Sequence, residues 1–187
     1  AYLIGKAIPV TIHLGLMSVV FSSILGISFG VIWALRRGTW LDTLFTLLAN
    51  LGITLPSFWL GILLIYFFAL KLLWLPVWGY TSPFEDFWMS ARQCVMPVFC
   101  LMLYPIASLT RQTRSCMLEV TRQDYIRTAW SKGLTEKVIV FRHTIKNALI
   151  PVITMLGMQV SVIFGGTVII ETVFNIPGMG RLMAQAV

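Results

Sequence analysis

Residues 124–151 read DYIRTAWSKGLTEKVIVFRHTIKNALIP, and this polar, basic stretch lies between two strongly apolar parts of the chain. A helix that crosses a membrane needs about 20 mostly apolar residues, so the stretch itself does not qualify. It contains good helix formers interrupted by a single glycine. We therefore expect two helices outside the membrane, connected at both ends to segments that cross it.

The first of these helices is expected to run from Arg122 to Lys132. Thr121 precedes it as a cap, and Asp124 follows three positions later, which resembles a capping box with Asp in place of Glu. Gly133 comes directly after the helix, and glycine is the residue that most often ends a helix in the left-handed conformation. The chain is therefore expected to turn at Gly133.

A second helix is predicted beyond the turn. Thr135 is placed to cap it, and Glu136 puts a negative charge at the positive end of its dipole. No helix breaker follows before Pro151, so this helix is expected to continue toward the next apolar span. Residues 121–147 thus form a helix–glycine–helix segment, which is called the elbow below.

The first helix of the elbow has an apolar face. Its residues follow the i, i+4 rule, and cations line the other faces. This arrangement suits insertion into a groove on a soluble partner; an amphipathic helix bound to lipid headgroups and a solvated loop are the alternatives. The apolar residues are Tyr125, Ile126, Ala129 and Trp130, and the cations are Arg122, Arg127 and Lys132.

The composition indicates an integral membrane protein, because 58% of the 187 residues are hydrophobic and 11% are charged, whereas a soluble domain carries about 25% charged residues. The net charge of +7 does not indicate nucleic acid, because the basic residues lie in short loops. The chain begins at Ala1 and ends at Val187, and we expect a fragment of a longer protein. The cysteines lack metal-site spacing and are expected to be unpaired packing residues: Cys94, Cys100 and Cys116.

Four stretches are long and apolar enough to cross a membrane. The second is interrupted by Pro56, and the third is short. The chain is therefore predicted to be an all-α, polytopic transmembrane bundle that forms a single domain over residues 1–187. The spans are predicted at about residues 11–35, 44–70, 93–110 and 148–170.

Loop charge predicts the direction of the spans. Loops rich in Lys and Arg stay in the cytoplasm, and ten of the fourteen basic residues lie either in segment 111–147 or at Arg36 and Arg37. That side is expected to be cytoplasmic. The loop 71–92 is expected outside, with four aromatic residues at the level of the lipid headgroups: Trp74, Trp78, Tyr80 and Trp88.

Small residues recur at every fourth position along two spans. Such a stripe lets helix backbones approach closely inside a membrane, so we expect close helix–helix contacts within the protein; dimerisation through the stripe is the alternative. The first span carries Ser18, Ser22, Gly26, Gly30 and Ala34, and the fourth carries Gly157, Ser161 and Gly165.

No charged residue lies inside a predicted span, and Glu171 stands just past the outer end of the fourth. Carriers coupled to protons or ions place ionisable groups at membrane depth. The pattern therefore favours a transporter driven from elsewhere or a passive pore. The chain has no GxxxxGK[ST] loop for a nucleotide and no HExxH metal motif, and no metal site is expected.

Several stretches resemble one family. The segment DYIRTAWSKGL…FRHTIKNALIPVI resembles the signature of the inner-membrane permease subunits of binding-protein-dependent ABC importers. Its Arg127-Thr128-Ala129 before Gly133 is the form usual in the oligopeptide/dipeptide/nickel branch. Trp130 and Ser131 depart from the Arg-Ala usual there. Further matching stretches are RRGTWLD at 36–42, TLPSFWLGILLIYFF at 54–68, LPVWGY at 75–80 and ETVFNIPGMGRL at 171–182, the last resembling the first of two paired permease types.

The resemblance implies the fold of a type I ABC importer in a bacterial or archaeal inner membrane. Two permease subunits would form the pathway, two cytoplasmic ATPase subunits would bind ATP and magnesium, and an extracytoplasmic solute-binding protein would deliver substrate. The permease itself would bind no cofactor and carry no catalytic residue. The elbow would couple to the ATPase through Asp124, Tyr125, Arg127, Thr128, Ala129, Trp130, Lys132, Gly133 and Leu134.

The substrate is left open by the sequence. The branch moves dipeptides, oligopeptides, glutathione, nickel complexes and some sugars. Peptides or related small solutes are the first expectation. Nickel or glutathione import within the same family is one alternative, and a channel or secondary transporter is another.

Overall fold

The computed structural model describes residues 2–186, and these residues form helices and no β-strand. They gather into two compact units, each built from stretches that are distant in sequence. Unit 1 contains residues 2–21, 54–104 and 160–186, and unit 2 contains Ser22–Ile53 and Pro105–Gln159. The all-α class predicted from the sequence is confirmed.

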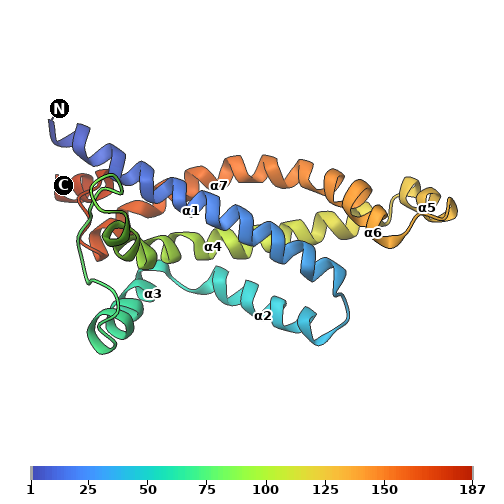
Figure 1. The fold of residues 1–187 in the computed structure, drawn as a ribbon, viewed down its shortest axis with the longest axis horizontal. Helices are drawn as coiled ribbons and strands as arrows, with labels where there is room; N and C mark the ends of the chain where they lie inside the picture. Colours follow the sequence, from blue (N-terminus) through green and yellow to red (C-terminus); the bar gives the residue numbers. More distant parts are fainter. Residues whose placement is uncertain (1, 187) are drawn as a thin grey trace. The chain divides into compact units, whose positions relative to one another are not determined.

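Three continuous helices among residues 2–186 are long and apolar enough to cross a membrane (Figure 1). The first is α1 (Tyr2–Leu35), the second is α4 (Phe87–Thr121), and the third is the helix over Glu136–Val173. At 1.5 Å per residue each is about 50 Å long or longer, more than the ~30 Å of the hydrocarbon layer. These helices therefore extend beyond the predicted spans.

The second predicted span is broken where the sequence indicates a break. Helix α2 (Trp40–Thr54) ends shortly before Pro56, and α3 (Ser57–Leu64) continues as the π-helix η1 (Ile65–Lys71). Proline has no N–H to donate and disfavours a helical conformation in the residue before it. The two helical pieces amount to a fourth span only when they are taken together.

The elbow begins later than the sequence suggests. Helix α5 runs over Asp124–Ser131, with Gln123 at the capping position. Thr121 is instead the last residue of α4, and its hydroxyl donates to Met117 O over 2.7 Å. The predicted helix from Arg122 with a Thr121 cap is therefore wrong, because the buried Met117 keeps the polar end of α4 helical.

The second helix of the elbow continues into the last long helix, as expected. It consists of α6 (Glu136–Val138), the π-helix η2 (Ile139–Thr144) and α7 (Ile145–Val173). Pro151 lies inside α7 without ending it. A short helix, α8 (Met179–Gln185), follows.

Each unit has an apolar core of its own. The core of unit 1 centres on Leu14, Met96 and Ile170, and the core of unit 2 on Leu109, Met117 and Val152. A smaller core of unit 2 lies inside the elbow. The cysteines are buried and unpaired, in keeping with a packing role: Cys94, Cys100 and Cys116.

Candidate functional site

The elbow turns at Gly133, whose φ of +75° is the left-handed conformation expected after a helix. The N–H of Gly133 donates to Trp130 O over 2.9 Å, and the N–H of Leu134 donates to Ala129 O over 3.4 Å. These bonds satisfy carbonyl groups at the end of α5. An added Cβ at Gly133 would meet no atom within 4 Å, so backbone conformation, rather than lack of space, favours glycine there.

Half of the predicted apolar face lies inside the elbow. Ile126 is 0% exposed and Ala129 is 6% exposed, and both belong to a small core with Ile139 of η2. Leu134 packs against the same core. Ala129 therefore does not lie on an outer surface, because the second helix covers it. The small core holds the two helices of the elbow together.

Two aromatic residues of α5 remain on the outside of the elbow. Tyr125 is 44% exposed and Trp130 is 50% exposed. Phe141 of η2 is exposed as well, and the sequence reasoning did not find it. Half-exposed aromatic side chains are the kind that binding surfaces bury.

The polar residues around this surface are held loosely. Arg127 and Asp124 form an ion pair of 3.4 Å between side chains that are 76% and 96% exposed. Such a pair contributes little to stability. Thr128 and Lys132 are also exposed. The cations are therefore available to a partner.

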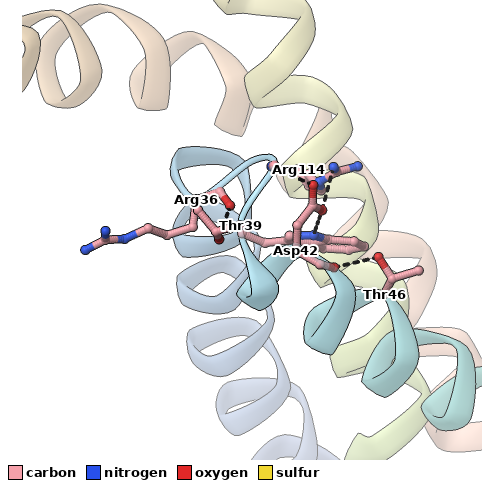
Figure 2. Close-up of polar contacts among 7 residues, drawn as sticks. Arg36, Thr39, Asp42, Thr46 and Arg114 are labelled. Atoms are coloured by element: carbon pink, nitrogen blue, oxygen red, sulfur yellow. Dashed lines mark hydrogen bonds and ion pairs between the residues drawn. The ribbon is translucent and has the colours of Figure 1, made fainter.

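A second polar arrangement of unit 2 lies at the turn between α1 and α2 (Figure 2). The carboxylate of Asp42 accepts a hydrogen bond from Gly38 N–H over 2.9 Å and one from Trp33 Nε1–H over 2.6 Å. It also accepts one from Arg114 Nη2 of α4 over 2.8 Å. The Arg114 guanidinium lies over the Trp33 indole, 4.4 Å from the ring centroid. We call Trp33, Gly38, Asp42 and Arg114 the Asp42 cluster.

The turn that carries Asp42 is stabilised by its own hydrogen bonds. Thr39 Oγ1 donates to Arg36 O over 2.6 Å, and Thr46 Oγ1 donates to Asp42 O over 2.7 Å. Gly38 has a φ of +75°, which glycine adopts without strain. The side chain of Arg36 points away from Asp42 in Figure 2. The cation bonded to Asp42 is therefore the distant Arg114 and not its neighbour in the turn.

Asp42 is an anion at neutral pH. It stands in the first turn of α2, ahead of the span predicted from residue 44. The N–H of Gly38 holds the pKa of this carboxyl below its ordinary value, and the indole N–H of Trp33 and the Arg114 charge act in the same direction.

The first stripe of small residues lies against α4 in unit 2. An added Cβ at Gly26 would lie 2.8 Å from Leu109 Cβ, and one at Gly30 would lie 2.7 Å from Thr110 O. Side chains larger than hydrogen would therefore separate α1 from α4. Ser18 and Ser22 are buried as well, and Ala34 packs against the unit 2 core.

The second stripe makes no such contact. An added Cβ at Gly157 or Gly165 would meet no atom within 4 Å, and Ser161 is exposed. Within residues 2–186 the close helix contact predicted for this stripe is therefore not made.

The stretch GISFG at residues 26–30 matches the GxSxG pattern of serine hydrolases. That pattern needs a strand-to-helix turn that presents the serine. Here it lies inside the continuous helix α1. The match therefore carries no catalytic meaning.

Unit 1 contains a buried carboxylate that the sequence places just outside a span. Glu171 lies in the last turn of α7 and is 0% exposed. Its Oε1 accepts a hydrogen bond from Thr11 Oγ1 over 2.6 Å, and its Oε2 accepts one from Arg181 N–H over 3.1 Å. Thr11 Oγ1 in turn accepts one from Met179 N–H over 2.9 Å. The carboxylate thereby joins α1, α7 and the start of α8.

Two glycines of the ETVFNIPGMG stretch are required by close packing around this carboxylate. An added Cβ at Gly178 would collide with the Glu171 carboxylate. One at Gly180 would collide with the backbone of Val168. Neither glycine is in the left-handed conformation, so lack of space is the reason for both.

Three of the four aromatic residues predicted for a headgroup belt are exposed. Trp74 and Trp78 lie in the loop after η1, and Trp88 lies in the first turn of α4. Tyr80 is partly buried instead, and its hydroxyl is 3.0 Å from His13 Nδ1 of α1. Tyr80 therefore helps to hold the loop against α1 within unit 1.

Residues 26–187 match the family described as binding-protein-dependent transport system inner membrane component. The chain belongs to this family. It is therefore a multi-pass inner-membrane permease, and the resemblance found in its elbow, turn and terminal stretch is confirmed. This permease is 44% identical over 187 residues to a putative peptide transport system permease protein of Brucella abortus. The match covers 98% of this chain and 59% of the relative.

Two further relatives are named for dipeptide transport. The permease is 42% identical over 185 residues to the dipeptide transport system permease protein DppB of Bacillus subtilis, covering 99% of this chain and 58% of the relative. It is 36% identical over 197 residues to the protein of the same name from Alkalihalophilus pseudofirmus, covering 95% and 59%. The chain thus spans about three fifths of the length of the relatives it matches.

Proposed function

We propose that this permease forms part of the translocation pathway of an ATP-driven importer for peptides or related small solutes, and that the elbow couples it to a cytoplasmic ATPase. The observation that carries the proposal is the pair Tyr125 and Trp130, which stay half-exposed on an elbow whose own core is closed. Aromatic residues of this kind act as anchors when a partner buries them. The peptide transport named in the relatives supports the substrate class.

The partners follow from this role. A second permease subunit completes the pathway, and two ATPase subunits bind ATP with magnesium. A solute-binding protein delivers substrate on the outer side. The permease contributes movement and a passage but no catalytic residue.

The test is transport by the complete importer in reconstituted vesicles. Gly133→Val strains the elbow, because a β-branched residue is unfavourable at φ +75°. Trp130→Ala removes an anchor worth about 2 kcal/mol or more, or roughly a thirty-fold loss in affinity for the ATPase. Both variants should leave the spans inserted and lower ATP-driven uptake of radiolabelled peptides. Trp40→Ala, which truncates an exposed tryptophan outside the elbow, is the matched control.

Unchanged uptake and ATP hydrolysis in both elbow variants would show that the elbow is not the coupling element. Competition separates the substrate classes. Unlabelled dipeptides and pentapeptides should inhibit uptake of labelled peptide. Inhibition by nickel or glutathione alone would move the importer to the alternative substrates.

A further inference from the structure

The donors to Asp42 come from two different parts of the chain. Two of the three donors to Asp42, Gly38 and Trp33, come from the end of α1 and the turn that follows it. The third, Arg114, comes from α4, which is 72 residues away in sequence. The carboxylate is thus oriented by its own turn before Arg114 is added. The carboxylate is thus a preformed acceptor, and Arg114 is the donor that joins α4 to it.

Arg114 is held by one hydrogen bond and by stacking on an aromatic ring. One hydrogen bond of 2.8 Å joins its Nη2 to Asp42, and its side chain is 26% exposed. The Trp33 ring covers one face of the guanidinium. Its buried Nε has no hydrogen-bond partner in the described part of the chain. A bidentate pair would be stronger, but stacking on Trp33 adds to the single hydrogen bond in holding the guanidinium in place.

A continuous stretch of helix connects Arg114 to the start of the elbow. Helix α4 continues without interruption from Arg114 to Thr121, a distance of about 10 Å at 1.5 Å per residue. Helix α5 then begins at Asp124. A force on the elbow is therefore transmitted along the end of α4 to Arg114. All of these residues belong to unit 2.

The backbone contact beside Arg114 strengthens this connection. An added Cβ at Gly30 of α1 would collide with Thr113, the residue before Arg114. The end of α1 thus packs closely against α4, and the ion pair joins the start of α2 to α4 at the next position along α4. Packing resists separation of α1 from α4, and the directional ion pair fixes α2 relative to α4.

We propose that Arg114 is a positioning residue, which through Asp42 keeps the α1–α2 turn aligned with α4 while the elbow moves. The inference rests on the proposed function, because it needs an ATPase that acts on the elbow. With the pair intact, a displacement of α4 carries the turn and α1 with it. With the pair removed, the elbow moves alone, and ATP hydrolysis is no longer converted fully into transport.

The experiment measures peptide uptake per ATP hydrolysed by the complete importer in vesicles, with its solute-binding protein and a labelled mixture of dipeptides and pentapeptides. Asp42→Asn and Arg114→Gln should lower this ratio about five-fold or more, the lower end of typical coupling between sites. The ATPase should still co-purify with the permease and hydrolyse ATP. Arg114→Lys keeps the charge but not the planar stacking group, so its ratio should be intermediate.

Two control variants match the changes in charge on the same helix. Arg111→Gln removes an exposed cation and Glu119→Gln removes an exposed carboxylate, and neither belongs to the cluster. Both should keep the parental ratio. The graded response of Lys and Gln at position 114, with a constant amount of assembled complex, is what a merely structural role would not produce.

An unchanged ratio in Asp42→Asn and Arg114→Gln overturns the inference. So does a parallel loss of uptake, hydrolysis and assembled complex in all three cluster variants, because the pair would then only stabilise the fold. The proposed function fails differently. In that case Gly133→Val and Trp130→Ala leave both uptake and ATP hydrolysis unchanged, or the parent shows no ATP-driven uptake.

Discussion

Asp42 of unit 2 and Glu171 of unit 1 both join parts of the chain that are far apart in sequence, but their surroundings differ. The Asp42 side chain is 22% exposed and receives a cation, Arg114. Glu171 is fully buried and receives neutral donors, the Thr11 hydroxyl and the Arg181 backbone N–H. The Arg181 guanidinium itself donates to Asn175 O.

The difference indicates how each region responds to force. A partly exposed ion pair can exchange its bond for water at little cost. A buried carboxylate cannot replace a lost donor with water, so each lost hydrogen bond leaves it with the full cost of desolvation. The Asp42 cluster is therefore suited to a contact that keeps its helices aligned during movement near water, whereas the Glu171 surroundings are suited to a contact that stays fixed.

The largest expected effect concerns the side of the membrane on which each region lies. Phe84 of the predicted outer loop is 99% exposed, and Phe141 of the elbow is 70% exposed. In a background with Cys94, Cys100 and Cys116 replaced by alanine, Phe84→Cys should react with an impermeant maleimide in intact cells. Phe141→Cys should react only after permeabilisation. Labelling of both in intact cells would contradict the predicted topology.

Removal of the buried carboxylate should be the most damaging single change to stability. Glu171→Ala leaves Thr11 and Arg181 N–H without their acceptor, at about 1–3 kcal/mol for each unsatisfied group. Thermal unfolding of the purified complex should show a large drop in midpoint. Glu119→Ala, an exposed carboxylate on α4, should show little change.

A conservative replacement sharpens the comparison. In Glu171→Gln the amide oxygen takes the Arg181 N–H, and the amide NH₂ donates to Thr11 Oγ1. The Thr11 hydroxyl then accepts a hydrogen bond from residue 171 and no longer donates one to it. The drop in midpoint should therefore be much smaller than in Glu171→Ala. Equal drops would mean that the negative charge, rather than the acceptor geometry, holds this region.

Helix packing within unit 2 gives the next effect. Gly30→Leu forces a branched side chain against Thr113 and Thr110, and overpacking of this kind costs about 1–3 kcal/mol or more. Gly157→Leu is the matched variant, because an added Cβ there meets nothing within 4 Å. The amount of folded permease should fall in the first variant only. A similar fall in the second would show that another helix covers that stripe.

Local patterns in the sequence predicted the local structure. Pro56 marks the broken span, and Gly133 marks the turn of the elbow, because each acts on its own backbone. Thr121 misled the prediction of the cap. A capping pattern has meaning only where a helix begins, and the apolar residues around Met117 extend α4 through it.

The long-range polar contacts could not be predicted in the same way. Thr11 and Glu171 are 160 residues apart, and Asp42 and Arg114 are 72 apart. Hydrophobic periodicity tells which face of a helix is buried but not which helix it meets. The sequence thus identified the RRGTWLD and ETVFNIPGMG stretches by resemblance, and the structure supplies a physical reason for each. Asp42 anchors the first, and close packing around Glu171 explains the second.

The smallest expected effect is the pH dependence of the Asp42 cluster. The pKa of this carboxyl is lower in the folded protein than its ordinary value of 3.8. A group with a depressed pKa contributes stability that is fully present above the ordinary pKa and is lost as the pH falls through the lower one.

The parent should therefore be slightly more stable than Asp42→Asn at pH 7. Unfolding midpoints of both, measured from pH 7 down to about pH 3, should converge as acid protonates the carboxyl. A difference in midpoint that stays constant over this range would mean that the shape of the Asp42 side chain, and not its charge, supports the turn. The ion pair with Arg114 would then contribute nothing to stability.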